Sequence, residues 1–115
     1  MLSLLPGGRI MIAVESVDGR KGIDSLAGLV RSVLKGDPLS GDLYVFKTRR
    51  ADKLKILAWM GDGFALYLRR LEKGTFAFPT ATDASVTVTP TQLAMILGGL
   101  DPAKTRERQR YKTSA

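Results

Sequence analysis

The sequence predicts a single α+β domain: an antiparallel β-meander of about four to five strands, with two helices packed on it and a basic C-terminal tail. Three short stretches of strand-forming residues, separated by turn residues, occupy the middle of the chain, and two helical patterns flank them. A chain of 115 residues supports one hydrophobic core of ordinary domain size. We expect one domain over residues 1–101 and a flexible basic tail over residues 102–115, where apolar periodicity is missing.

The N-terminal third predicts one strand and one helix. Residues 9–14 are mostly aliphatic and follow a Pro-Gly-Gly turn, which is typical of a short strand. From Ile23 onward the apolar residues recur at spacings of three and four, which is the stripe of an amphipathic helix. We expect this helix to stop at Gly36, with Lys35 in its last turn and Pro38 just beyond.

The middle of the chain predicts the meander. Its strands are expected over residues 43–48, 53–60 and 64–71, connected by residues 49–52 and by a tight turn at 61–63. A fourth strand is expected over residues 85–88, and a short extended piece over residues 75–78.

The second helix has a clear start signal. Thr89 suits the N-cap, Pro90 the first helical position, and Gln92 completes a capping box. The helix is expected to end at Gly98-Gly99.

The net charge of +7 is unevenly distributed. Residues 43–73 carry eight basic and three acidic residues, and residues 101–115 carry five and two, whereas residues 1–42 are neutral. Such segregation suggests a polyanion or an acidic protein as partner. A charged surface that only keeps the domain in solution explains it equally well.

The absence of two residue types excludes several kinds of chemistry. Without cysteine or histidine the chain has no disulfide, no thiol nucleophile, no catalytic triad and no imidazole or thiolate metal site. We therefore expect no enzymatic activity and no cofactor. Lack of cysteine fits a reducing compartment, and no stretch approaches the roughly 20 apolar residues that span a bilayer. We expect a cytoplasmic protein with no membrane partner.

Strand alternation predicts an aromatic and basic face on the meander. A three-residue turn at 61–63 would pair Trp59 with Ala65, Leu57 with Tyr67 and Lys55 with Arg69, and the residues 49–52 connection would add Tyr44, Phe46 and Lys53 to that face. The opposite face would hold only apolar side chains: Leu54, Ile56, Ala58, Met60, Phe64, Leu66 and Leu68. Aromatic rings between cations can stack on bases and contact phosphates. A helix covering this face, with the aromatics as packing, is the alternative that we favour.

Two further basic clusters lie in expected turns. Arg49 and Arg50 would occupy a hairpin tip beside Lys53, a position suited to phosphate contacts. Arg20 and Lys21 precede the first helix, where backbone amides could join them on an anion. Solvated turns and ordinary helix-start chemistry are equally good explanations of the two clusters.

Several short strings occur in the order found in one known family. They are Arg20-Lys21-Gly22-Ile23-Asp24-Ser25-Leu26, Asp37-Pro38-Leu39-Ser40-Gly41, Leu43-Tyr44-Val45-Phe46 followed by Arg49-Arg50, Lys55-Ile56-Leu57, Trp59, Gly63-Phe64, Leu66-Tyr67, Arg70-Leu71-Glu72-Lys73-Gly74, Gln92-Leu93-Ala94 and Gly98-Gly99-Leu100-Asp101. Over about residues 5–101 the chain resembles the TnpB-type protein, encoded by the second open reading frame, of the insertion sequence 66 family of bacterial transposable elements. It departs from the family pattern with Phe78 before Pro79 in place of tryptophan, Met60 in place of an acid and Arg69 in place of lysine.

The resemblance implies a non-catalytic accessory protein that acts beside the transposase in DNA transposition and recombination. One hypothesis is that it binds element DNA, with phosphate or base contacts from Arg20, Lys21, Arg49, Arg50, Lys53, Lys55, Trp59, Tyr67 and Arg69. The alternative is a protein-interaction adaptor that docks the transposase or another element-encoded protein through the aromatic face without touching DNA. A metal-dependent nuclease built on the aspartates is a third hypothesis, from which we expect no activity. Self-association as a homo-oligomer is left open.

Overall fold

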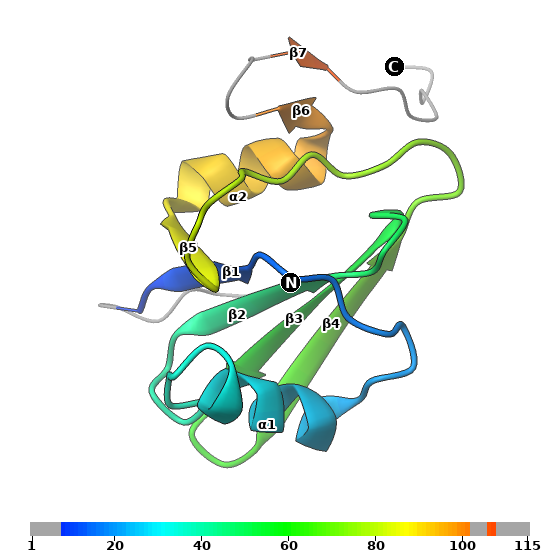
Figure 1. Cartoon of the computed structure of the whole chain (residues 1–115). Helices are drawn as coiled ribbons and strands as arrows, with labels where there is room; N and C mark the ends of the chain where they lie inside the picture. Colours follow the sequence, from blue (N-terminus) through cyan, green and yellow to red (C-terminus); the bar gives the residue numbers. More distant parts are fainter. Residues whose placement is uncertain (1–7, 102–105, 108–115) are drawn as a thin grey trace.

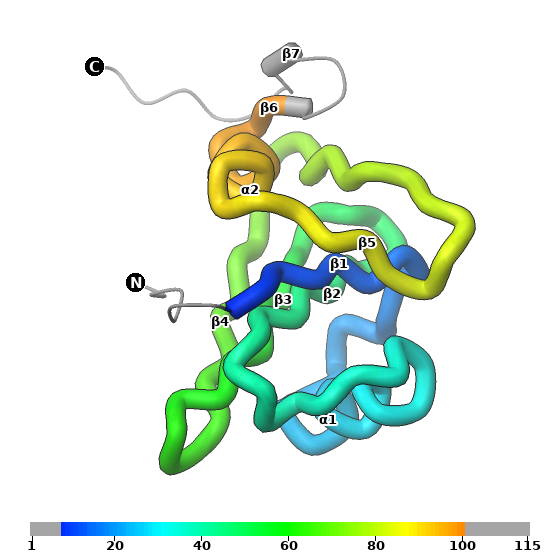
Figure 2. Tube along the Cα trace, turned by 90° about the vertical axis from the view of Figure 1, so that its left-hand side faces the viewer, coloured from blue at the N-terminus to red at the C-terminus, as the bar shows by residue number. Residues whose placement is uncertain are grey.

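The computed structural model describes residues 8–101 and 106–107, and it has three layers (Figure 1). A five-stranded sheet lies between two helices, with α1 below it and α2 above it in Figure 1, and Figure 2 shows the same layers from the side. The elements are β1 (Ile10–Ala13), α1 (Ile23–Ser32), β2 (Leu43–Lys47), β3 (Lys53–Trp59), β4 (Phe64–Arg70), β5 (Ser85–Val88), α2 (Pro90–Gly98), β6 (Leu100–Asp101) and β7 (Arg106–Glu107). The α+β prediction is confirmed.

The sheet is mixed, with the strand order β4-β3-β2-β1-β5. The meander β2-β3-β4 is antiparallel as predicted, and β5 is antiparallel to β1. β1, however, runs parallel to β2, with Ile10 opposite Leu43 and Ile12 opposite Val45. The reason is the crossover: α1 carries the chain back along one face, so β2 starts at the same end of the sheet as β1.

Both faces of the sheet are buried. On the α1 face, Leu26, Ala27 and Val30 of the helix pack against side chains that include Tyr44 and Phe46. On the α2 face, a second cluster of buried residues joins the strands to the helix and to the segment after β4: Ile10, Ile12, Leu43, Val45, Leu54, Ile56, Ala58, Phe76, Val88, Leu93 and Ile96. The central strands β2 and β3 therefore contribute to two cores.

The helix signals are confirmed at α2 and partly at α1. The Thr89 hydroxyl accepts from the Gln92 N–H, the Gln92 side chain accepts from the Thr89 N–H, and Pro90 opens α2. α1 begins at Ile23 as predicted but ends at Ser32, before Gly36. Lys35 follows with a φ of 56° and so lies outside the helix.

The predicted pairing of β2 with β3 is confirmed. Tyr44 lies opposite Leu57 and Phe46 opposite Lys55, as the four-residue connection requires.

The predicted pairing of β3 with β4 is wrong by one residue. Trp59 lies opposite Phe64, Leu57 opposite Leu66 and Lys55 opposite Leu68. β3 ends at Trp59 and β4 starts at Phe64, so Met60 belongs to a four-residue connection. The Met60 N–H donates to the Gly63 carbonyl at 2.8 Å across it. A shift of one residue moves every side chain of β4 to the other face, so the expected aromatic and basic face and the expected purely apolar face do not exist as grouped.

Two other expectations concern the C-terminal half. Residues 75–78 form no strand; instead the Phe76 N–H donates to the Ala51 carbonyl at 2.7 Å and the ring enters the core. The predicted basic tail, residues 102–115, lies outside the described residues except for Arg106–Glu107, which pairs with Leu100–Asp101. Within the described part of the chain, no helix is long and apolar enough to cross a membrane.

Gly36 is required by a close approach of Tyr44. A Cβ at position 36 would lie 2.7 Å from the Tyr44 Oη, which itself donates to the Asp37 carbonyl at 3.1 Å. Tyr44 is 1% exposed and cannot move aside without disturbing the α1 core.

We expect Gly36→Ala to lower the free energy of unfolding by about 1–3 kcal/mol, because the buried phenol must shift. Gly28→Ala is the matched control: nothing lies within 4 Å of its added Cβ, and alanine favours the helix, so stability should stay level or rise. Urea denaturation measures both variants. Equal stabilities of the two variants would contradict this account, and Tyr44→Phe should reduce the cost of Gly36→Ala.

Asp42 links the residues that directly precede β1 and β2. It accepts from the Arg9 N–H at 2.8 Å and from the Arg9 guanidinium at 3.0 Å. Burial by itself would raise the pKa of the Asp42 carboxyl, but the hydrogen bonds from Arg9 and Ser40 outweigh it and hold the pKa below its ordinary value of 3.8.

Because the folded pKa is depressed, the stabilisation by Asp42 is complete above the unfolded value of 3.8 and is lost as the pH falls through the lower, folded value. Asp42→Asn should cost about 1–2 kcal/mol of unfolding free energy at pH 7. The difference from the wild type should shrink as the pH falls below about 3.8. Denaturation curves across this range test it, and a difference that is constant with pH would contradict it.

Candidate functional site

The basic residues of the meander gather at one end of the sheet. β2 ends there, β3 begins there and β4 ends there, since Lys47 pairs with Leu54 and Lys53 with Arg70. We call this the basic end and define it by its cations: Arg20, Lys21, Lys47, Arg49, Arg50, Lys53, Lys55, Arg69 and Arg70.

The loop before α1 is tied to the basic end by backbone contacts. The Val17 N–H donates to the Lys47 carbonyl at 2.8 Å, and Val17 forms a parallel bridge with Thr48. Arg20 and Lys21 follow directly. The two basic clusters that the sequence predicted separately are therefore neighbours.

Lys55, on the α1 face of β3, holds this loop in place by hydrogen bonds to its backbone. Its ammonium donates to the carbonyls of Gly19 and Lys21, both at 2.6 Å, and the residue is 7% exposed. The aliphatic stem lies beside Phe46 on the strand, while the head bonds to the backbone. Lys55 was expected to contact phosphate, but its donors are engaged inside the fold.

Arg49 and Arg50 occupy the centre of the turn between β2 and β3. The Ala51 N–H donates to the Thr48 carbonyl at 2.9 Å, which closes a β-turn around the two arginines, and both are exposed. A shallow cleft of about 290 Å³ lies between this turn and the Asp18-Gly19 loop, with Arg49, Arg50 and Lys53 on its wall. The expected position of these cations at a hairpin tip is confirmed.

Besides Lys55, three cations of the basic end have partners. Arg20 pairs with Asp18 at 2.9 Å and Arg70 with Glu72 at 2.6 Å, and Lys47 lies 5.2 Å from the centre of the Phe78 ring. The side-chain hydrogen bonds from Arg20 hold the pKa of the exposed Asp18 carboxyl well below its usual range, so Asp18 is charged at neutral pH. Within residues 8–100, no acidic side chain forms an ion pair with the remaining cations of the basic end: Lys21, Arg49, Arg50, Lys53 and Arg69.

The aromatic residues do not join the basic end. Trp59 lies at the other end of β3, with its ring 5.0 Å from that of Phe64, and Tyr67 packs against the α2 core. Tyr44 and Phe46 are each 1% exposed beneath α1. The alternative in which a helix covers the aromatics is therefore confirmed for Tyr44 and Phe46.

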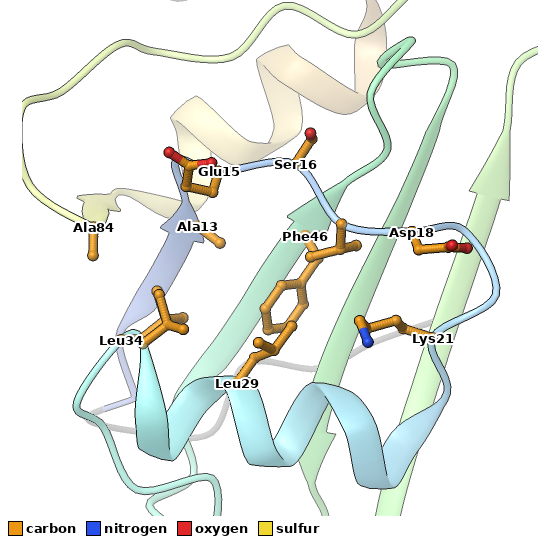
Figure 3. A pocket seen from close by; sticks show the side chains of 11 residues that line it. Ala13, Glu15, Ser16, Asp18, Lys21, Leu29, Leu34, Phe46 and Ala84 are labelled. Carbon is orange, nitrogen blue, oxygen red and sulfur yellow. The ribbon is translucent and has the colours of Figure 1, made fainter.

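A second cavity, of about 330 Å³, lies between α1 and the loop after β1 (Figure 3). Phe46 from β2 reaches toward Leu29 of α1 there, and Asp18 and Lys21 stand at one side. Its lining is largely apolar. Within the part of the chain that the structure describes, no three acidic residues cluster in a way that could hold a metal ion.

Comparison with known proteins agrees with the strings noted in the sequence. The family model described as IS66 Orf2 like protein matches residues 8–107. The chain belongs to the IS66 Orf2-like family. Members of this family are transposition-associated accessory proteins.

Two relatives come from Sinorhizobium fredii. The uncharacterized protein y4jC is 37% identical over 102 residues, which is 89% of this chain and 87% of y4jC. The uncharacterized protein y4hO is 40% identical over 101 residues, which is 85% of this chain and 88% of y4hO. No solved structure matches this IS66 Orf2-like chain.

Lys55→Met should test the structural role of the buried ammonium. Methionine keeps the stem but leaves two carbonyls without their donor, so we expect a loss of about 1–3 kcal/mol in unfolding free energy. Amide hydrogen exchange should also accelerate in residues 18–22. Lys53→Met is the control, because Lys53 is half-buried and lies two residues before Lys55 on the same strand. If both substitutions changed stability and exchange equally, the contact with the loop would not be the cause.

Proposed function

We propose that this accessory protein binds element DNA through the basic end, by contacts to the phosphate backbone. The observation that carries the proposal is the convergence of cations from three segments of the chain on one end of the sheet. Most of them have no acidic partner among the described residues. A surface of this charge attracts a polyanion and releases its counterions on binding.

The proposed contact set is smaller than the sequence indicated. Arg49, Arg50 and Lys53 line the cleft beside the turn. Arg69 lies at the same end of the sheet on β4, opposite Leu54 and therefore on the α2 face. Lys21 adds a cation from the loop that Lys55 holds. Arg20 is exposed and could exchange Asp18 for a phosphate, whereas Lys55 acts through the loop that it fastens.

Duplex DNA fits the basic end better than a single strand does. Proteins that bind single strands without sequence preference combine cations with aromatic rings on which bases stack. Trp59 lies at the far end of β3, and Tyr67 is partly buried against the α2 core, so neither accompanies the cations. Phosphate contacts carry no sequence information directly, and we expect weak sequence preference.

The salt dependence of binding measures the number of phosphates contacted. With about five contacts, the logarithm of the affinity for an element-end duplex should fall against the logarithm of the salt concentration with a slope of about −4.5. Fluorescence anisotropy with labelled duplex at several salt concentrations gives this slope. Absence of binding at low salt would refute the proposal.

Substitutions at the turn should reduce both affinity and slope. Arg49→Ala combined with Arg50→Ala removes two exposed cations, so the magnitude of the slope should drop by about 2. Arg31→Ala combined with Lys35→Gly is the matched control, because it removes two positive charges from the last turn of α1 and the segment that follows it. Glycine is chosen at position 35 because it tolerates the positive φ there. An equal loss in both variants would indicate a response to net charge rather than to this surface.

Association with the transposase or another element-encoded protein stays a prediction. Its expected surface, the aromatic face, does not form as grouped: Tyr44 and Phe46 are buried beneath α1, and Tyr67 lies on the α2 face. Co-purification of the transposase with the wild-type chain and with the two-arginine variant measures this separately from DNA binding.

A further inference from the structure

β4 is an edge strand with a complete set of backbone groups on its open side. It stands at one end of the strand order, and all seven of its residues pair with β3. The opposite edge strand, β5, has only four residues. A long edge strand is a template on which another strand can pair.

Two hydrogen bonds at the ends of the ladder establish which groups of β4 point outward. The Leu71 N–H donates to the Asp52 carbonyl at 2.7 Å, and the Met60 N–H donates to the Gly63 carbonyl at 2.8 Å. Hydrogen-bonded pairs alternate along an antiparallel ladder, so residues 65, 67 and 69 face β3. The backbone groups of residues 64, 66, 68 and 70 therefore point away from the sheet.

Leu68 is an anomaly on this edge. It is 56% exposed, the largest fraction among the exposed large apolar side chains of the described residues. It lies on the same face as Phe64 and Leu66, which pack at the margin of the α1 core. Its N–H and C=O are among those that point outward, so among the described residues neither its side chain nor its backbone has a neighbouring strand on that side.

We propose that β4 pairs with β4 of a second copy of this chain, antiparallel and centred on Tyr67, to form one continuous ten-stranded sheet. In this register Leu66 lies opposite Leu68 of the other copy, and the pair occurs twice because of the two-fold symmetry. The four outward-facing residues of one strand meet those of the other, so every open backbone group of β4 acquires a partner. The exposed Leu68 side chains become covered by leucine.

The charges of β4 are compatible with this register. Arg69 lies opposite Ala65 and Arg70 opposite Phe64 of the other copy, so no two arginines face each other. The arginine pairs of the two copies lie at opposite ends of the shared ladder, about 20 Å apart for a seven-residue strand. The strand is thus complementary to itself, which is the reason to choose a second copy as its partner.

The test is the oligomeric state of the full chain by sedimentation equilibrium over a concentration series. We expect a monomer–dimer equilibrium in the wild type. Leu68→Lys should raise the dimer dissociation constant about 100-fold, since the substitution removes two buried leucines from each dimer. Leu39→Lys is the matched control, because Leu39 is 46% exposed in a loop away from β4 and the variant has the same charge. A monomeric wild type, or equal effects of the two variants, would overturn the proposal.

Disulfide cross-linking tests the proposed register of the β4–β4 pair. Because the chain has no cysteine, a single introduced cysteine can cross-link only with its counterpart in the second copy. Tyr67 faces its own copy as a non-hydrogen-bonded pair, with Cα atoms about 4.5 Å apart, which is within the range of a disulfide. Under mild oxidation Tyr67→Cys should form a covalent dimer, and Ala65→Cys, whose copies would lie about four residues apart along the ladder, should not. Cross-linking of Ala65→Cys instead, or of neither variant, would overturn the register. Both measurements are made without DNA, so their failure is distinct from a failure of the proposed DNA binding.

Discussion

The crossing of α1 over one face of the sheet is the constraint on which the rest of the molecule depends. Because β1 and β2 are parallel, the connection between them must return along the sheet, and the helix covers Tyr44, Phe46 and their neighbours. With α2 and Phe76 on the opposite face, the central strands β2 and β3 have no open face among the described residues. Charged side chains of the central strands can then reach water only at the ends of the strands. The concentration of cations at one end is thus a consequence of burial on both faces.

Lys55 illustrates how strict this constraint is. It is buried beneath the covered α1 face near the start of β3, where a charge without hydrogen-bond partners would be costly. Two backbone carbonyls of the loop before α1 supply the partners. The same contacts bring the Arg20-Lys21 pair of residues to the turn of β2 and β3. A residue whose charge is used inside the fold therefore helps to assemble the surface on which other charges are displayed.

The parts of the structure that the sequence could predict are those with local signals. The Thr89 capping box, the start of α1 and the four-residue connection after Lys47 each depend on residues close in the chain, and each is confirmed. The β3–β4 register could not be predicted, because both faces are buried and the alternation of apolar and polar residues carries little information about register. The burial and hydrogen bonds of Lys55 could not be predicted either, since the carbonyls that accept from it are 34 and 36 residues away in the chain. Charge segregation along the sequence was a sound indicator of the basic end, whereas the aromatic residues were misleading because they serve the cores.

Ala51 has a φ of 57°, a conformation that residues with a side chain rarely adopt. It persists because the surrounding backbone holds it: its carbonyl accepts from Phe76, and Asp52 beside it accepts from Leu71. The segment carrying Arg49 and Arg50 is consequently set by the folding of the whole domain. A ligand that meets these arginines finds the main chain already ordered, so little of its binding free energy is spent on immobilising the loop.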